Sequence, residues 1–217
     1  MRVDVWSDLV CPWCYIGKRR LEHALEQFEH RASIEVVHRS FQLHPEVPAG
    51  GTISRREMLK HKYRLSDDEV ATMDERLERL AAEDGLDYDL SGDQTGNTVD
   101  AHRLAHLGRV SGRQDQVVER LFRAHFTEQR SIFDHQSLIA LGTDAGLDPA
   151  EAAQVLDGDR FAKEVRDDHE EAGLLGSRGV PFFVLAGRYA ISGAQPGDVF
   201  SETLQRAWDA TTRPATS

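Results

Sequence analysis

The chain has 217 residues, enough for one large domain or for a domain that carries an insertion. Its net charge of −11 argues against a nucleic acid or an anionic membrane surface as the main partner. The N-terminus runs straight into a strand-like segment without an apolar export signal, and no apolar run approaches the ~18 residues of a membrane span. These features predict a cytoplasmic protein without a membrane partner.

The first expected element is a short β-prone run from Val3 to Trp6, which leads through a turn into Cys11-Pro12-Trp13-Cys14. Apolar residues then recur at helical spacing, at Leu21, Leu25 and Phe28. The pattern predicts a strand followed by a helix, with Cys11 at the helix cap and Cys14 one turn further on. Pro12 suits the first helical position, because its missing N–H would have no partner there.

This placement of two thiols favours thiol–disulfide exchange. The free N–H groups and the positive end of the helix dipole favour a thiolate at Cys11, and Cys14 is close enough to attack a mixed disulfide formed there. Three other interpretations remain: inert packed thiols, a zinc site, and a structural disulfide. Zinc would need two more ligands, and the chain has no further cysteine and no clear histidine pair near a turn. A structural disulfide is not expected without an export signal.

Residues 33–41 are rich in β-branched side chains and predict a second strand. Because a helix joins it to the first strand, the two strands are expected to be parallel, with a right-handed crossover. The loop at 43–51 contains two prolines and two adjacent glycines, which is typical of a domain boundary.

The next hundred residues have helical patterns. Sequences of the capping-box type begin helices at 54–57, 66–69 and 148–151, and further helices are expected at 98–109, 114–128 and 134–145. Residues 91–96 are expected to form a polar loop, and no segment between Gly50 and Asp157 resembles a strand strongly.

The C-terminal part predicts a helix at 160–175, a hairpin that turns at Gly187-Arg188, and a last helix at 197–208. The whole pattern predicts an α/β protein with a thioredoxin fold and a large all-helical insertion between its two halves. Residues 1–50 and 157–213 would form the thioredoxin-like domain, and residues 51–156 would form the insertion.

Three separated motifs support this assignment by resemblance. They are Cys-Pro-Trp-Cys-Tyr-Ile-Gly at 11–17, Asn-Thr at 97–98 with Ala-His-Arg-Leu at 101–104, and Gly-Val-Pro-Phe-Phe-Val at 179–184 with Ile-Ser-Gly-Ala-Gln at 191–195. Together they resemble the FrnE-like branch of the DsbA family, and the likeness extends from Val3 to about Trp208. That family consists of thioredoxin-fold proteins with a helical insertion that act as protein-disulfide oxidoreductases.

The resemblance implies that Cys11 is the attacking thiol and Cys14 the resolving one, with Pro12 and Trp13 shaping the site between them. Val180-Pro181 would be the cis-proline dipeptide that faces the two cysteines. The alternative for Pro181 is a trans proline that starts an edge strand. By the same resemblance, Asn97 and His102 are candidate substrate contacts. Phe182 is a third candidate, as one of the aromatic side chains expected to form an apolar rim for a substrate.

Trp13 stands where the DsbA pattern has a histidine, which can stabilise the thiolate. We therefore expect a less oxidising site than that of DsbA, suited to reduction, isomerisation or glutathione-linked exchange of a protein or small-molecule disulfide. No tightly bound cofactor and no metal are expected, although His102 and His106 stand one helical turn apart.

Two other functions remain open. One is a glutathione-dependent isomerase or transferase related to 2-hydroxychromene-2-carboxylate isomerase, and the other is a binding or chaperone module. Cys14 favours the oxidoreductase, because the isomerase relatives have no need of a second thiol. Both a monomer and a homodimer are compatible with the sequence.

Overall fold

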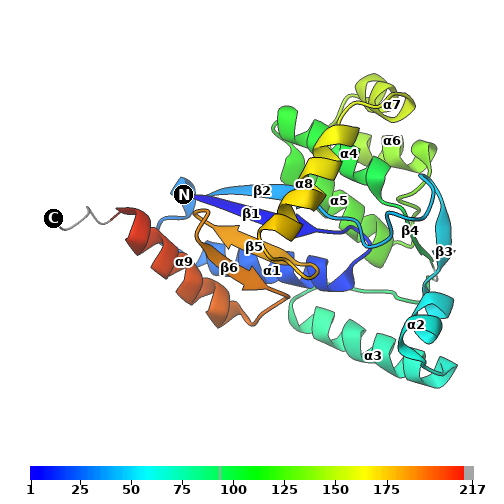
Figure 1. The fold of residues 1–217 in the computed structure, drawn as a ribbon, viewed down its shortest axis with the longest axis horizontal. Coiled ribbons are helices and arrows are strands. Elements are labelled where there is room, and N and C mark those ends of the chain that lie inside the picture. Colours follow the sequence, from blue (N-terminus) through cyan, green and yellow to red (C-terminus); the bar gives the residue numbers. More distant parts are fainter. Residues whose placement is uncertain (93, 213–217) are drawn as a thin grey trace.

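A four-stranded sheet with the order β2-β1-β5-β6 lies at the centre of the thioredoxin-like part (Figure 1). The structure is a computed structural model, and it describes residues 1–92 and 94–212. β1 (Arg2–Ser7) pairs in parallel with β2 (Glu35–Ser40) and antiparallel with β5 (Phe182–Leu185), which forms a hairpin with β6 (Tyr189–Ser192). The predicted strand–helix–strand unit and C-terminal hairpin are therefore confirmed.

Helices cover both faces of this sheet (Figure 1). α1 (Pro12–Glu26) and α9 (Gly197–Thr212) pack on one face, while α8 (Ala162–Leu174) crosses the other. The alternation of side chains along β1 explains both contacts, because Val3 and Val5 join the core with α1 and α9 and Trp6 points to α8. Trp6 Nε1 donates a hydrogen bond to the Asp168 carbonyl at 2.8 Å, which fastens α8 to the sheet.

The segment between the two halves is mostly helical, as the sequence predicts. Its helices are α2 (Arg55–Tyr63), α3 (Asp67–Glu83), α4 (Val99–Val110), α5 (Gln114–Phe126), α6 (His135–Asp144) and α7 (Pro149–Asp157). Outside this segment, a short 3-10 turn, Arg31–Ser33, lies between α1 and β2. Ser66 and Glu69 form the complete capping box at the start of α3. Ser54 and Asp148 each accept a hydrogen bond from the backbone N–H three residues further on, at the starts of α2 and α7.

The expectation that this segment contains no strand was wrong. β3 (Thr52–Ser54) and β4 (Gln94–Gly96) pair antiparallel and bracket α2 and α3. Strands of three residues are too short to show a period of two, so the sequence pattern could not reveal them. A Cβ atom at Gly96 would lie 2.3 Å from the Gly51 carbonyl oxygen, so glycine permits this close pairing. Asp93, in the predicted polar loop, lies outside the described residues.

The apolar core runs from the thioredoxin-like part into the helical segment. Cys14, Tyr15 and Ile16 at the start of α1 share one buried cluster with side chains of α4 and α5, such as Leu104 and Phe122. The division into a thioredoxin-like domain and an insertion, with boundaries at residues 50 and 157, therefore stays a prediction. The predicted end of the thioredoxin-like domain, residue 213, lies outside the described residues. Within the described parts of the chain, no helix combines the length and the apolar character that a membrane crossing requires.

Candidate active site

The two cysteines lie at the N-terminus of α1. Cys11 is the N-cap with an extended backbone (φ −92°, ψ 111°), and Pro12 follows within the first turn. The Cys14 N–H donates to the Cys11 carbonyl at 2.9 Å, which closes that turn. Both side chains are free thiols, without a disulfide between them. The predicted helix-cap position of Cys11 is thus what the structure has.

The two thiols differ in their surroundings. Cys14 is 1% exposed, whereas Cys11 is 6% exposed and lines an open cleft. Burial, together with the hydrogen bond and charge of the neighbouring Cys11 sulfur, raises the pKa of Cys14 well above its ordinary value. The arrangement can therefore present one sulfur to an incoming molecule and keep a protonated partner behind it.

Asp8 stabilises the turn that precedes Cys11, a role that was not apparent from the sequence. The side chain is fully buried, and one carboxylate oxygen accepts from the Thr98 hydroxyl at 2.8 Å while the other accepts from the Leu43 N–H at 2.6 Å. The Asp8 carbonyl accepts from the Cys11 N–H at 3.1 Å. One residue thus connects the cysteine turn to α4 and to the loop after β2. The only local signal would have been an acidic residue in a turn before a helix.

Two tyrosines hold the start of α1 against the helical segment. The Tyr88 hydroxyl donates to the Pro12 carbonyl at 2.7 Å, and its ring stacks on those of Tyr15 and Phe126. The Tyr15 hydroxyl donates to Glu119 of α5 at 2.7 Å, and Lys18 donates to the same carboxylate at 2.7 Å. These contacts couple the position of the cysteines to α5.

Val180 and Pro181 face the cysteines from the loop before β5. The peptide bond between them is cis, and the Cys11 thiol donates to the Val180 carbonyl at 3.7 Å. Gly17 of α1 permits this approach, because a Cβ atom there would lie 3.0 Å from Pro181 Cγ and 3.1 Å from Phe183 Cζ. A small residue one turn after Cys14 therefore sets the distance between the helix and the proline.

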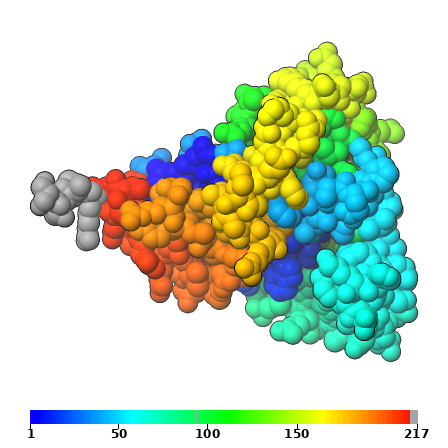
Figure 2. All heavy atoms as spheres, in the orientation of Figure 1, coloured from blue at the N-terminus to red at the C-terminus, as the bar shows by residue number. Residues whose placement is uncertain are grey.

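A cleft of about 700 Å³ opens beside Cys11. Its floor is formed by Cys11, Pro12 and Trp13, and its far wall by α2 and α3. Figure 2 shows dark blue atoms from the start of the chain at the bottom of a hollow between the cyan α2–α3 region and the yellow to orange segment that follows α8. Of the three floor residues, Trp13 is the most accessible, at 43% exposure. The sequence did not indicate that α2 and α3 would form its wall.

None of the three candidate substrate contacts, Asn97, His102 and Phe182, is among the described residues that line this cleft. The Asn97 amide donates to the Val47 carbonyl at 2.6 Å and accepts from Gln42 at 3.0 Å. His102 is 3% exposed and lies 3.0 Å from the Phe41 carbonyl. Phe182 is 5% exposed and packs against Trp6, with 5.9 Å between the ring centroids. Their contact with a substrate stays a prediction.

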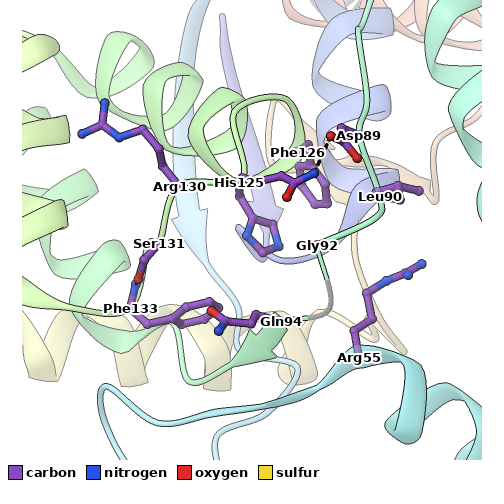
Figure 3. Close-up of a pocket in the computed structure, with 11 residues that line it drawn as sticks. Arg55, Asp89, Leu90, Gly92, Gln94, His125, Phe126, Arg130, Ser131 and Phe133 are labelled. Atoms are coloured by element: carbon purple, nitrogen blue, oxygen red, sulfur yellow. Dashed lines mark hydrogen bonds between the residues drawn. The ribbon is translucent and has the colours of Figure 1, made fainter.

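A second cavity, of about 260 Å³, lies between β4, α2 and the end of α5 (Figure 3). The His125 ring points into it, and Arg55 lies on the opposite side. Burial lowers the pKa of His125 to about 4, so its imidazole is neutral at pH 7. Gln129 donates to Asp89 at the rim. Among the described residues, no three histidine, cysteine or acidic side chains are grouped as a metal site would need.

Several known proteins share this architecture. A probable DsbA oxidoreductase from Streptomyces coelicolor is 42% identical, with a TM-score of 0.93 over 100% of this chain and 93% of that one. The cytosolic disulfide reductase DsbM from Pseudomonas aeruginosa, solved with GSH, is 21% identical, with a TM-score of 0.65 over 96% and 99% of the two chains. A 2-hydroxychromene-2-carboxylate isomerase is 16% identical, with a TM-score of 0.73 over 97% and 98%. The last two likenesses concern the fold alone.

The family model of the DSBA-like thioredoxin domain matches residues 2–205, nearly the whole chain. The predicted relationship to the DsbA family and the predicted thioredoxin fold are confirmed. With its cysteines at the tip of α1 and its helical segment between the two halves of the fold, this chain belongs to the DSBA-like thioredoxin family.

Proposed function

We propose that this protein is a FrnE-like thiol–disulfide oxidoreductase that works through Cys11 and Cys14. The observation that carries the proposal is the unequal placement of the two sulfurs. Cys11 caps α1 and lines the cleft, while Cys14 is buried one turn behind it. A helix N-terminus favours an anion at its cap, so Cys11 is the sulfur suited to attack.

The exchange proceeds in two steps. The Cys11 thiolate attacks one sulfur of the substrate disulfide, the S–S bond breaks, and one substrate thiolate leaves. Cys14 then gives up its proton and attacks Cys11 Sγ, which releases the second substrate thiolate and leaves a Cys11–Cys14 disulfide. Two electrons pass from the dithiol to the substrate. Two molecules of a thiol such as glutathione then reduce the protein disulfide again and leave joined as their own disulfide.

We propose that the net direction in the cell is reduction, isomerisation or glutathione-linked exchange, in the cytoplasm. Trp13 carries no charge with which to stabilise a thiolate, which favours a couple less oxidising than that of DsbA. The reference potentials are about −270 mV for thioredoxin and about −120 mV for DsbA, a difference of about 7 kcal/mol. The likeness in fold to a cytosolic disulfide reductase that was solved with GSH is compatible with this direction.

Reduction of insulin tests the proposal directly. The wild-type protein with glutathione as electron donor is expected to accelerate the precipitation of the insulin B chain, and Cys11→Ser is expected to abolish the acceleration. Cys14→Ser should stop multiple turnover but still form a mixed disulfide. Acceleration that survives Cys11→Ser would contradict the proposed role of this thiol.

A glutathione-dependent isomerase or transferase is the second candidate. The fold likeness to 2-hydroxychromene-2-carboxylate isomerase and the apolar cleft beside Cys11 favour it. An isomerase would not need Cys14 as a reacting group. Glutathione-dependent turnover of an aromatic substrate that persists in Cys14→Ser would therefore support this second function over disulfide exchange.

A further inference from the structure

The charge of the cleft is opposite to that of the protein. The chain has 37 acidic and 26 basic residues, yet no acidic side chain is among the described residues that line the cleft. Three of the lining residues are cationic: Arg55, Lys62 and Arg76. A basic lining in an acidic protein attracts anions and repels cations.

Two of these cations have no carboxylate partner among the described residues. Arg55 is held by Asp74 through two hydrogen bonds of 2.6 and 3.1 Å. In the described parts of the chain, by contrast, neither Lys62 nor Arg76 forms an ion pair, and Lys62 Nζ lies 5.6 Å from the centre of the Tyr63 ring. Both side chains are exposed at the cleft and available to an anion from solvent.

Most of the other side chains that line the cleft are apolar. Met58 of α2 and Met73 of α3, two of the three methionines in the chain, both line the cleft. Methionine is flexible and polarisable and makes favourable contacts with aromatic rings. Tyr63 and Trp13 add exposed aromatic surface, at 57% and 43% exposure. The cleft therefore offers apolar surface to an aromatic or bulky apolar group in the same space that Cys11 and the cations line.

Access to Cys11 limits the size of the partner. The side chain is only 6% exposed, and the cleft of about 700 Å³ is the opening that it lines. A volume of this size is typical of sites for small molecules. A small disulfide can enter a cleft of this size and reach the sulfur.

We propose that the cleft binds an anionic, aromatic disulfide of low molecular weight, with its negative group at Lys62 and Arg76 and its ring against Met58, Met73 and Tyr63. The inference rests on the proposed function and specifies its substrate class. The bound disulfide reacts as described above: Cys11 displaces one aromatic thiolate, Cys14 displaces the second, and the protein leaves the reaction as the disulfide.

Two probes separate the inference from the proposed function. The reduced protein is mixed with dithiobis(nitrobenzoate), an anionic aromatic disulfide, or with dithiodipyridine, a neutral aromatic one. Release of two thiols per protein from the neutral probe tests the exchange itself, and its absence would overturn the proposed function and the inference with it. The ratio of the two rates tests the charge of the cleft.

Lys62→Gln and Arg76→Gln are each expected to lower the rate with the anionic probe about threefold at low ionic strength and to leave the neutral probe unchanged, an effect that salt reduces. Arg79→Gln removes an equal charge from an exposed position on the same helix, outside the cleft, and should change neither rate. Equal losses in Arg76→Gln and Arg79→Gln, or no loss in either, would overturn the assignment of the anion.

The aromatic part of the proposal needs its own variant. Tyr63→Ser should lower the rates with both aromatic probes and leave the rate with dithiodipropionate, an anionic aliphatic disulfide, unchanged. Because Tyr63 is 57% exposed, the substitution is expected to leave the fold intact. Equal loss for the aliphatic probe would show that the wall does not select a ring.

Discussion

The distance between α1 and Pro181 can be tested by adding one methyl group at Gly17. In Gly17→Ala the new Cβ would lie 3.0 Å from Pro181 Cγ and 3.1 Å from Phe183 Cζ. Both neighbours are buried, and Phe183 is 0% exposed, so neither can move freely. The variant therefore forces the helix and the proline loop apart by a few tenths of an ångström.

Two effects of opposite sign decide the magnitude. Overpacking lowers the free energy of unfolding by about 1–3 kcal/mol, whereas replacement of glycine by alanine inside a helix raises it by about 1 kcal/mol. We expect a net loss of up to about 2 kcal/mol in the free energy of unfolding, with about 2–4 °C in Tm for each kcal/mol in a chain of this size. The Val180 carbonyl contacts the Cys11 thiol, so the exchange rate with dithiodipyridine should fall as well.

Urea unfolding of matched variants provides the measurement. Gly173→Ala, near the end of α8, is the control, because a Cβ atom there would meet nothing within 4 Å. We expect the control to gain roughly 0.5–1 kcal/mol and to keep the wild-type exchange rate. A Gly17→Ala variant that is stabilised as much as the control, with unchanged exchange, would refute the tight approach of α1 to Pro181.

Two further residues give independent predictions. Tyr88→Phe keeps the aromatic stack but loses the 2.7 Å hydrogen bond to the Pro12 carbonyl, so it should lower the free energy of unfolding by about 0.5–1.5 kcal/mol; an unchanged urea midpoint would contradict this. Burial lowers the pKa of His125 to about 4 in the folded protein, from 6.5 in the unfolded chain. Between pH 4 and pH 6.5, His125 is therefore protonated mainly in the unfolded state. Stability should therefore fall by up to about 3 kcal/mol as the pH drops from 6.5 to 4, and His125→Gln should flatten that slope in urea titrations at several pH values.

The elements of the thioredoxin-like part could be predicted because their signals are local. Cys-Pro marks the start of α1, the β-branched run marks β2, and Gly187 marks the hairpin turn, where its φ is +64°. Each of these depends on a few consecutive residues, and the order of the elements then specifies the sheet. The resemblance carried by the three motifs then predicted the DsbA family.

The walls of the site could not be predicted, because they depend on contacts between distant residues. Asp8 acts through Leu43 and Thr98, which are 35 and 90 residues away in sequence. The amphipathic pattern of α3 shows that Leu77 lies on the apolar side of the helix. It does not show that this side lines the same cleft as Cys11. The short strands β3 and β4, which place α2 and α3 beside the cysteines, carry no period in the sequence.

The central claim is that Cys11 captures a disulfide and Cys14 resolves it, and a trapping experiment tests this most directly. Each single serine variant is incubated with glutathione disulfide, and its intact mass is measured before and after treatment with a reductant. The account predicts that Cys14→Ser accumulates one glutathione adduct on Cys11 that the reductant removes, while Cys11→Ser, whose remaining thiol is 1% exposed, accumulates none. An adduct that forms equally fast on Cys14 in the Cys11→Ser protein would contradict the assignment of the two thiols.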